Sequence, residues 1–592
     1  MGGGMGGFMS SFATSSGKID PPTSLTATVA SDTQINLSWT APTGNVTGYK
    51  IERENPVGGG WSVIVSNTGS ATTTYNNTGL TANTQYNYRV SAISGALVSQ
   101  PSSSANSTTY DSNASAYIVS IGDIPTHQKN AINTRVLAFK ANNTWDDLHF
   151  WFPAPSTQTW DEFTRELKNN NKPGVIRTGN PVADVTLESD YDPRIVASGS
   201  GFIMTTVNSQ VGTFKTNYAP SAFMTLNDSC WGMIAQDDVI AAAGFTGGVF
   251  NSASASMIFQ KRDATNVLYT DAYNTTNNAG RARQTSSSGA GGNFIFNRAS
   301  ATDLKIYRDG TQIAASTGGG GTLPTNNIMV NGYLNAATAG NVRNETVGSI
   351  YAYTRSLSSA EVTQENTDWQ TFMTAMKRTG TYNKAIVWSG NSHSVMFYGA
   401  MHRKMNYNFS TNEWFWRNAS KHGRTTTQIN AALGSEVEPF LNANNGTNYV
   451  FLWEATNDIS AGLTGALAWA QYQAFTTEIR SYCTTNSIPV HLVAVPSMCR
   501  RFDGNDTAIL ETNEFNELLR DNWSGEFDSY TGSFGSNLWI WRDDYGSDAA
   551  YITAVRALCN NTTYYDSGGT HLNKETYLNE CAPIFINHIN TN

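Results

Sequence analysis

The hydrophobic pattern of this 592-residue chain changes near Thr381, and that change constrains the fold more than any other feature. From Thr381 onward, short apolar runs alternate with longer helical segments. The strand candidates are residues 385–388, 449–453, 490–495 and 538–541, and the helix candidates are residues 464–483, 508–521, 548–559 and 574–588. This alternation predicts a parallel sheet with helices on both faces over residues 381–592.

The segment 19–110 has a different pattern, made of short half-buried strands. Pro21-Pro22 opens it, and residues 35–39 alternate toward Trp39, a candidate core residue. Tyr86 lies where a tyrosine hydroxyl would bond to the backbone a few residues upstream. On these residues the segment resembles a fibronectin type III domain, which implies an all-β sandwich that serves as a spacer or adhesive unit.

Residues 111–380 begin with a helical pattern (Ile132, Val136, Leu137 and Phe139) and continue as many short alternating runs broken by Gly, Asn, Ser and Thr. Regularly spaced short strands predict a sandwich or jelly roll. The stretches 307–313 and 348–362 resemble the corresponding parts of concanavalin-like (laminin-G-like) lectin folds. Sugar binding and a purely structural role are both open for this part, and we name no ligand residues in it.

Composition limits the classes of partner. The formal net charge is -9 and the chain has no basic run, so we expect no nucleic-acid partner. Each apolar stretch is shorter than the roughly 20 residues of a membrane helix, so we expect no membrane insertion. The five cysteines are scattered and predict buried, reduced thiols, although four of them lie in the last 110 residues and leave one or two bridges open.

Residues 1–18 are rich in Gly, Met and Ser and lack the charged and apolar regions of a secretory signal. Such a segment cannot fold alone, because glycine loses the most conformational entropy on ordering. We therefore hypothesise that residues 1–18 are an anchor that docks into a larger assembly.

The first apolar run after Thr381 ends in Gly390-Asn391-Ser392, a turn of small residues. Open parallel sheets place their reactive crevices at the carboxyl ends of strands. Ser392 is therefore the candidate nucleophile. A serine hydroxyl needs a base to take its proton, and His571 is the histidine with a suitable local setting. Asp566 is the nearest acid to orient His571.

On these motifs, residues 381–592 resemble an SGNH hydrolase of the GDSL esterase superfamily, which implies a flavodoxin-like α/β/α fold and a serine esterase without cofactor or metal. The family's G-D-S block is Gly390-Asn391-Ser392, with Asn in place of Asp. Its G-x-N-D block is Ala455-Thr-Asn457-Asp458, with Ala in place of Gly. Its D-x-x-H block ends at His571, where Gly568 stands at the acid position.

The resemblance also implies an oxyanion hole made by the N–H groups of Ser392 and Gly423 and the side-chain amide of Asn457. The acid that orients the histidine stays open between Asp566, Asp543, Asp544 and none. Asp566 would serve if the Gly568-Gly569 turn folds its loop back.

The remaining histidines, Glu454 and the aromatic run 414–416 are expected to have structural rather than catalytic roles. His393, His402 and His422 lack the spacing of a metal motif. We expect Glu454 to be a strand-end acid rather than a second catalytic carboxylate. The aromatic run 414–416 is expected in the core, with a sugar platform as the alternative.

The module combination is typical of bacteriophage tail or fibre-type proteins. We expect a homo-oligomeric virion protein whose partners are other tail proteins and a bacterial surface glycan, from which the esterase removes O-acetyl groups. Two alternatives remain: a receptor-binding adhesin with a degenerate SGNH fold, and a cellular secreted carbohydrate esterase.

Overall fold

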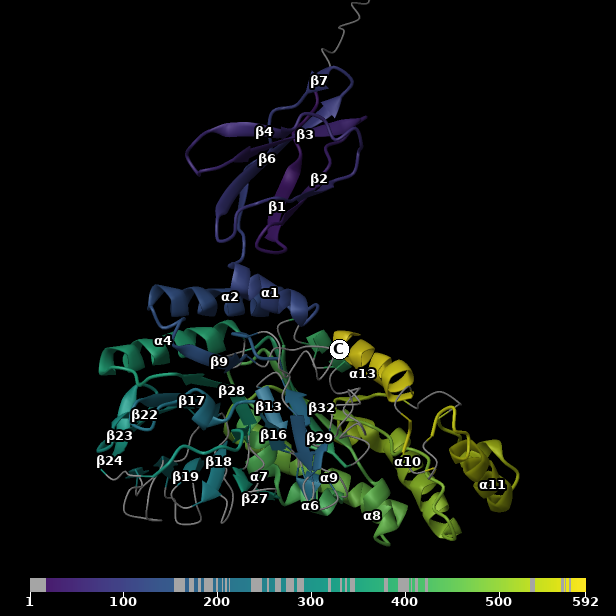
Figure 1. Cartoon of the computed structure of the whole chain (residues 1–592). Helices are drawn as coiled ribbons and strands as arrows, with labels where there is room; N and C mark the ends of the chain where they lie inside the picture. The colour runs from purple at the N-terminus through teal and green to yellow at the C-terminus, as the bar shows by residue number, and fades with distance from the viewer. Residues whose placement is uncertain are drawn as a thin grey trace, which may run out of the picture. The chain divides into compact units, whose positions relative to one another are not determined.

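The computed structural model describes residues 18–591 with internal gaps. The gaps are residues 154–164, 170–174, 179–182, 186–194, 199–200, 205, 208–209, 212, 236–246, 253–254, 261–267, 273–281, 285–291, 318–320, 331–332, 336–337, 341–345, 377–381, 392–403, 406, 410–411, 413, 421–423, 533–537, 566–568, 570 and 574–575. The chain divides into two compact units, Met1–Ala116 and Tyr117–Asn592 (Figure 1). Among the described helices, none has the length and apolar character to cross a membrane.

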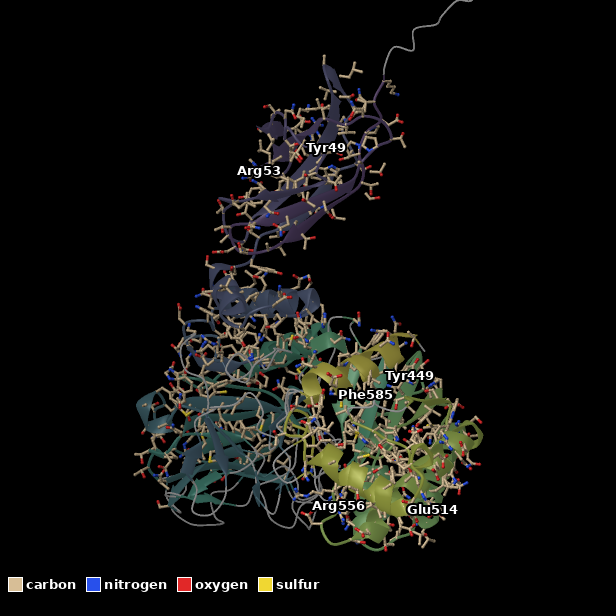
Figure 2. All side chains as sticks on the ribbon, turned by 90° about the vertical axis from the view of Figure 1, so that its right-hand side faces the viewer. Tyr49, Arg53, Tyr449, Glu514, Arg556 and Phe585 are labelled. Carbon is tan, nitrogen blue, oxygen red and sulfur yellow. The ribbon has the colours of Figure 1, made fainter. Side chains whose placement is uncertain are left out.

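The first unit is a sandwich of two antiparallel sheets. One sheet contains β1 (Thr23–Val29), β2 (Ile35–Thr40) and β5 (Thr74–Asn77), and the other contains β3 (Gly48–Glu54), β4 (Trp61–Val65), β6 (Gln85–Ser94), β7 (Leu97–Val98) and β8 (Ala105–Thr108). Trp39 and Tyr49 pack edge to face in its core with ring centroids 4.9 Å apart. Figure 2 labels Tyr49 among the side chains of this unit. The N–H of Thr81 donates to the hydroxyl of Tyr86 at 2.9 Å. The predicted core tryptophan and the tyrosine corner are therefore confirmed.

The second unit starts with a β-sandwich, preceded by α1 (Ser112–Ser120), which spans the boundary between the units. Its first sheet contains β9 (Leu148–Phe152), β12 (Ile195–Ser198), β13 (Gly201–Met204), β17 (Ser229–Ala235), β22 (Gly292–Ser300), β23 (Asp303–Arg308), β24 (Thr311–Ser316) and β28 (Thr346–Tyr353). Its second sheet contains β10 (Val175–Thr178), β11 (Ala183–Val185), β16 (Thr213–Lys215), β18 (Gly247–Ser252), β19 (Ala255–Gln260), β20 (Leu268–Ala272), β21 (Ala282–Gln284), β25 (Met329–Val330), β26 (Tyr333–Asn335) and β27 (Thr338–Gly340). A short hairpin of β14 (Thr206–Val207) and β15 (Gln210–Val211) and a 3-10 turn (Pro220–Ala222) complete it.

The two sheets share one apolar core. Phe294 and Phe296 of the first sheet lie 4.9 and 4.6 Å from the ring of Phe259 in the second. All three rings are buried, together with Met233 and Val249. Alternate residues of facing strands supply this core, which is the geometry of a sandwich.

Two helices lie side by side over the first sheet, α2 (Thr126–Ala141) and α4 (Ser359–Ala375) (Figure 1). The predicted helical pattern is confirmed, since Ile132, Val136 and Phe139 are buried. Arg135 of α2 is 1% exposed and donates to Glu365 of α4 at 2.5 Å. This buried ion pair links the two helices.

The remaining part is an open parallel sheet. The described residues form five strands in the order β30 (Phe415–Asn418), β29 (Lys384–Gly390), β31 (Thr447–Trp453), β32 (Val490–Ala494) and β33 (Ser529–Tyr530). All neighbours are parallel. Numbered along the chain, the order is 2-1-3-4-5, which is the flavodoxin-like arrangement.

Three of the four predicted strands are confirmed as β29, β31 and β32. The fourth was wrong, because residues 538–541 are irregular. Leu538 and Trp539 are nevertheless buried, so their apolar character reflects packing in a loop. The fifth strand is instead the short β33. The aromatic run 414–416 lies in and beside β30, where Phe415 and Trp416 are buried, so the expected core role is confirmed for both.

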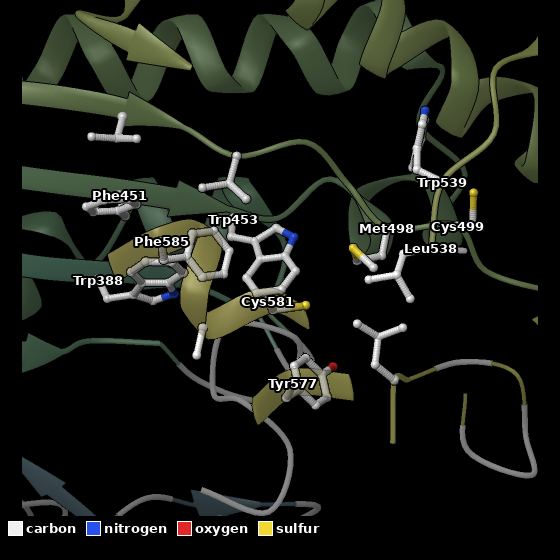
Figure 3. Packing of buried hydrophobic residues seen from close by; sticks show 14 of the residues in the cluster. Trp388, Phe451, Trp453, Met498, Cys499, Leu538, Trp539, Tyr577, Cys581 and Phe585 are labelled. Carbon is white, nitrogen blue, oxygen red and sulfur yellow. The ribbon is translucent and has the colours of Figure 1, made fainter. Parts of the chain in front are cut away.

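The side chains of the central strands alternate between two buried faces. Trp388, Phe451 and Trp453 pack on one face against Phe585 of α13 (Ala582–Thr591), as Figure 3 shows. The rings of Trp388 and Phe585 are 4.7 Å apart. α11 (Asp548–Cys559) and a π-helical turn (Tyr577–Cys581) cover the same face. The opposite face lies under α6 (Thr426–Asn430), α7 (Leu433–Glu436), α9 (Gly465–Thr485) and α10 (Asp506–Glu526), with a 3-10 turn at Glu438–Phe440.

These layers confirm the predicted covering of the sheet on both faces, and with both faces closed, the strand ends are where chemistry can reach solvent. The five cysteines are free and buried, as expected.

At the amino end of the sheet, the hydroxyl of Ser529 lies 2.8 Å from Nε2 of His491 and 2.9 Å from Nε2 of His588. Burial lowers the pKa of both imidazoles. Lys384 donates to the carbonyl of Ile589 at 2.8 Å. These contacts fasten α13 to the edge opposite the predicted site.

Candidate functional site

The chain reverses its direction of travel across the sheet between β29 and β31. The connection after β29 leads to β30 on one side, and the connection after β31 leads to β32 on the other. Loops that part in this way leave a crevice at the carboxyl ends of the two strands. Gly390 pairs with Trp453 in the register, and the N–H of Asn391 donates to the carbonyl of Trp453 at 3.3 Å.

The side chains that follow these two strands also meet. Nδ2 of Asn391 donates to Oε2 of Glu454, and both residues are buried, at 1% and 0% exposed. The N–H of Glu454 donates to the hydroxyl of Tyr472 at 2.8 Å. Burial raises the pKa of Glu454 well above its usual range, and the charge of Asp458 adds to this rise. Glu454 directly follows β31, so its predicted position at a strand end is confirmed.

Sequence reasoning missed the bond between Asn391 and Glu454. The available signal was their position, because each residue directly follows one of two apolar runs that lie next to each other in a sheet of this order.

Asn457 lies in the first turn of α8 (Thr456–Ser460) and is half-buried. Its Nδ2 donates to the carbonyl of Arg424 at 2.7 Å. An amide NH₂ group carries two hydrogens, so one remains for a ligand. The amide expected in the oxyanion hole is thus bonded to the residue that follows Gly423 in the chain, and Gly423 is one of the two other residues expected there.

Asp458 fixes the start of α6 rather than capping its own helix. The N–H of Thr426 lies 3.1 and 3.0 Å from the two carboxylate oxygens, and the Thr426 hydroxyl donates at 2.6 Å. Both residues are fully buried. Burial raises the pKa of Asp458, and these hydrogen bonds oppose the rise. Asp458 therefore holds the segment that begins at Arg424 against α8.

The backbone of Ala455 has φ +73°, a conformation that residues with a side chain rarely adopt. Glycine adopts it without strain. The position at which the resembled motif carries glycine is therefore one where the fold demands a glycine-like backbone. Alanine holds that conformation here at a cost of about 1–3 kcal/mol.

His571 is half-buried near the end of a closed loop. Tyr565 and Leu572 form an antiparallel bridge, and Gly569 between them has φ +60°. The N–H of Arg501 donates to the carbonyl of Gly569 at 3.1 Å. This bridge brings Tyr565 and Leu572 side by side, so the two ends of the loop that carries His571 meet. Leu572 is buried in the same cluster as Trp453.

Asp543 and Asp544 lie in a 3-10 turn (Arg542–Asp544) and are exposed. An acid that fixes a catalytic imidazole works by a hydrogen bond shielded from water. Their exposure weighs against both as that acid.

Three predicted site residues, Ser392, Gly423 and Asp566, lie outside the described residues, as do His393, His402 and His422. Of the residues at this edge, the structure joins Asn391 to Glu454, Asn457 to Arg424 and Asp458 to Thr426. Within the described part of the chain, no cluster of three or more His, Cys, Asp or Glu side chains has the arrangement of a metal site.

Comparison with known proteins identifies one domain. Residues 20–108 match the fibronectin type III domain family, so the chain carries such a domain there. An Fn3-like protein from Clostridium thermocellum is 33% identical, with a TM-score of 0.14, over 15% of this chain and 92% of that one. Domains A168–A170 of titin are 27% identical, with a TM-score of 0.14, over 16% of this chain, which spans about a third (32%) of that structure. Among curated proteins, no match is found.

Proposed function

We propose that residues 381–592 are a serine esterase of the SGNH type. The observation that carries the proposal is the anchoring of Asn391, the residue before Ser392. Its backbone bonds to Trp453 and its side chain bonds to Glu454, so Asn391 itself is held at the switch point of the sheet. That is where open α/β sheets place their ligands.

In this proposal the hydroxyl of Ser392 attacks the carbonyl carbon of an ester while His571 takes its proton. The N–H groups of Ser392 and Gly423 and the amide of Asn457 stabilise the negative oxygen of the tetrahedral intermediate. His571 then gives its proton to the leaving alcohol, and water hydrolyses the acyl-serine by the same steps. Asp566 holds the imidazole. Each oxyanion donor contributes about 100- to 1,000-fold in rate.

The bond of Asn457 to Arg424 supports this set of donors, because Arg424 is the residue that follows Gly423 in the chain. The chemistry needs no metal or organic cofactor.

We propose that the natural substrate is an O-acetylated polysaccharide of a bacterial surface, and that the chain is a tail or fibre-type component of a bacteriophage virion. In this arrangement the fibronectin type III domain is a spacer, and the sandwich of residues 111–380 is a concanavalin-like module. Residues 1–18 anchor a homo-oligomer to other virion proteins. The support is the succession of two β-sandwiches before a parallel α/β part.

The esterase is tested with p-nitrophenyl acetate and with acetate release from capsular polysaccharide. We expect Ser392→Ala to lower kcat by at least about 1,000-fold. Ser394→Ala, which changes another serine of the same stretch, is the matched control and should stay within about threefold. Equal activity of wild type and Ser392→Ala would refute the proposal. An inactive wild type that still binds the polysaccharide would favour the adhesin.

The virion assignment has a separate test. Antibodies against residues 20–108 should label purified phage particles, and labelling of cell-free secreted protein alone would favour a cellular esterase.

A further inference from the structure

We propose that Glu454 is a positioning residue that holds Asn391, the residue before the candidate nucleophile Ser392, and that the pair of Asn391 and Glu454 requires one amide and one carboxyl group. The inference rests on the proposed esterase function. It assigns to a residue outside the catalytic set the task of fixing the turn after β29.

Glu454 is a buried residue whose carboxyl group holds a neighbouring side chain by a hydrogen bond. Its side chain is 0% exposed, and Oε2 accepts the hydrogen bond from Asn391. Among the described residues, Oε1 has no hydrogen-bond partner. Burying a carboxyl group with so few partners costs several kcal/mol, and an apolar side chain would avoid that cost. A carboxyl group kept there despite this cost indicates a task, and its contacts are with Asn391, the residue before Ser392, and with the backbone N–H of Asn457.

The amide of Asn391 suits this carboxyl in either protonation state. An amide donates to a carboxylate through its NH₂ group, and it accepts from a neutral carboxyl through its oxygen. The bond therefore persists at any working pH. A carboxyl at position 391 would meet Glu454 as a like group, and the pair would hold together only while the two shared a proton. This explains why this chain has Asn where the resembled motif has Asp.

The other charged or titratable groups near Glu454 come from three elements. Asp458 of α8 raises its pKa, while Arg500, in the loop after β32, lowers it. Tyr472 of α9 contacts its backbone. These groups are the same in each variant below, so differences between pH profiles report the pair itself.

The experiment measures kcat and KM of the full chain between pH 5 and 9 for Asn391→Asp, for Glu454→Gln and for the double variant. In Asn391→Asp, the two carboxyls share a proton at low pH and repel at high pH. Its activity should therefore fall by about 10- to 100-fold as pH rises, where wild-type activity reaches its plateau, because a small displacement of a reacting group costs up to about 100-fold. KM should stay within about threefold.

The double variant Asn391→Asp with Glu454→Gln restores one carboxyl and one amide with their places exchanged. It should recover the wild-type pH profile and come within about threefold of wild-type kcat. Glu454→Gln alone keeps an acceptor and should lose less than about tenfold.

The control is Glu526→Gln, because Glu526 also accepts side-chain bonds, from Gln473 at 3.0 Å and Thr476 at 3.1 Å. If the role of Glu454 is merely structural, Glu526→Gln and Glu454→Gln should both lower Tm without changing the pH profile of kcat.

Recovery by the double variant ties the defect of Asn391→Asp to its pair with Glu454, and the Tm of each variant, measured alongside kcat, separates a loss of positioning from a loss of folding. An unchanged pH profile in Asn391→Asp, or no recovery in the double variant, would overturn the inference alone. An inactive wild type would overturn the esterase proposal and the positioning role together.

Discussion

Replacing Asp458 by alanine removes the acceptor of two buried donors at once, the N–H and the hydroxyl of Thr426. Each buried donor left without a partner costs about 1–3 kcal/mol. The carboxyl group's own cost of burial is removed at the same time, which offsets part of this loss. We expect a net loss of about 2–3 kcal/mol in local stability, which is roughly a 30- to 150-fold increase in the opening constant.

The assay is amide hydrogen exchange of the full chain, followed by mass spectrometry in peptides that cover α6 and α8. Exchange in these peptides should speed up by the same 30- to 150-fold factor, because local opening governs it. Because Asp458 holds α6 against the helix of Asn457, we expect kcat on p-nitrophenyl acetate to fall by at least about tenfold.

Asp548→Ala is the matched control, since Asp548 also lies in the first turn of a helix of the same sheet part. Its ion pair with Arg542 is 2.6 Å long but nearly half-exposed on both sides. Exposed pairs contribute about 0–1 kcal/mol. The reasoning would be refuted if Asp458→Ala changed exchange no more than Asp548→Ala did.

Three further predictions concern other parts of the chain. Gly569→Ala should destabilise the loop before the candidate base by about 1–3 kcal/mol, because the φ of Gly569 is +60° and the new Cβ would lie 2.9 Å from a backbone oxygen. Amide hydrogen exchange and kcat of this variant test the prediction, and wild-type values of both would contradict it. Tyr86→Phe should cost the fibronectin domain about 1–2 kcal/mol in urea unfolding, because the N–H of Thr81 loses its acceptor, and an unchanged midpoint would refute the corner's role. Burial lowers the pKa of His491 and His588, so the unfolded chain binds more protons and the stability of the fold should fall as pH drops below about 6.5. His588→Gln should flatten the fall in Tm between pH 7 and 5. Equal slopes of Tm against pH in wild type and variant would exclude these two histidines as the cause.

Local pattern was sufficient wherever an element is long and its neighbours are close in sequence. α11 was predicted with the observed bounds, and β31 within two residues, because a buried helix or strand needs a long periodic run of apolar side chains. Tyr86 was recognisable because its partner Thr81 lies five residues away.

Prediction failed where tertiary packing overrides local preference. Residues 538–541 are as apolar as a strand, yet they fill a core position as a loop. β33 is two residues long and is a strand only because β32 pairs with it. Neither outcome is encoded in a short window of sequence.

For the site, the sequence by itself determined the order of the candidate motifs and their place after apolar strands. Only the tertiary structure decided that β29 and β31 are neighbours, and hence that Asn391 meets Glu454 and that Asp458 holds Thr426. Those partners are 63 and 32 residues apart along the chain. Contacts over such separations depend on how strands are ordered in a sheet, and strand order follows from burial of both faces rather than from any local propensity.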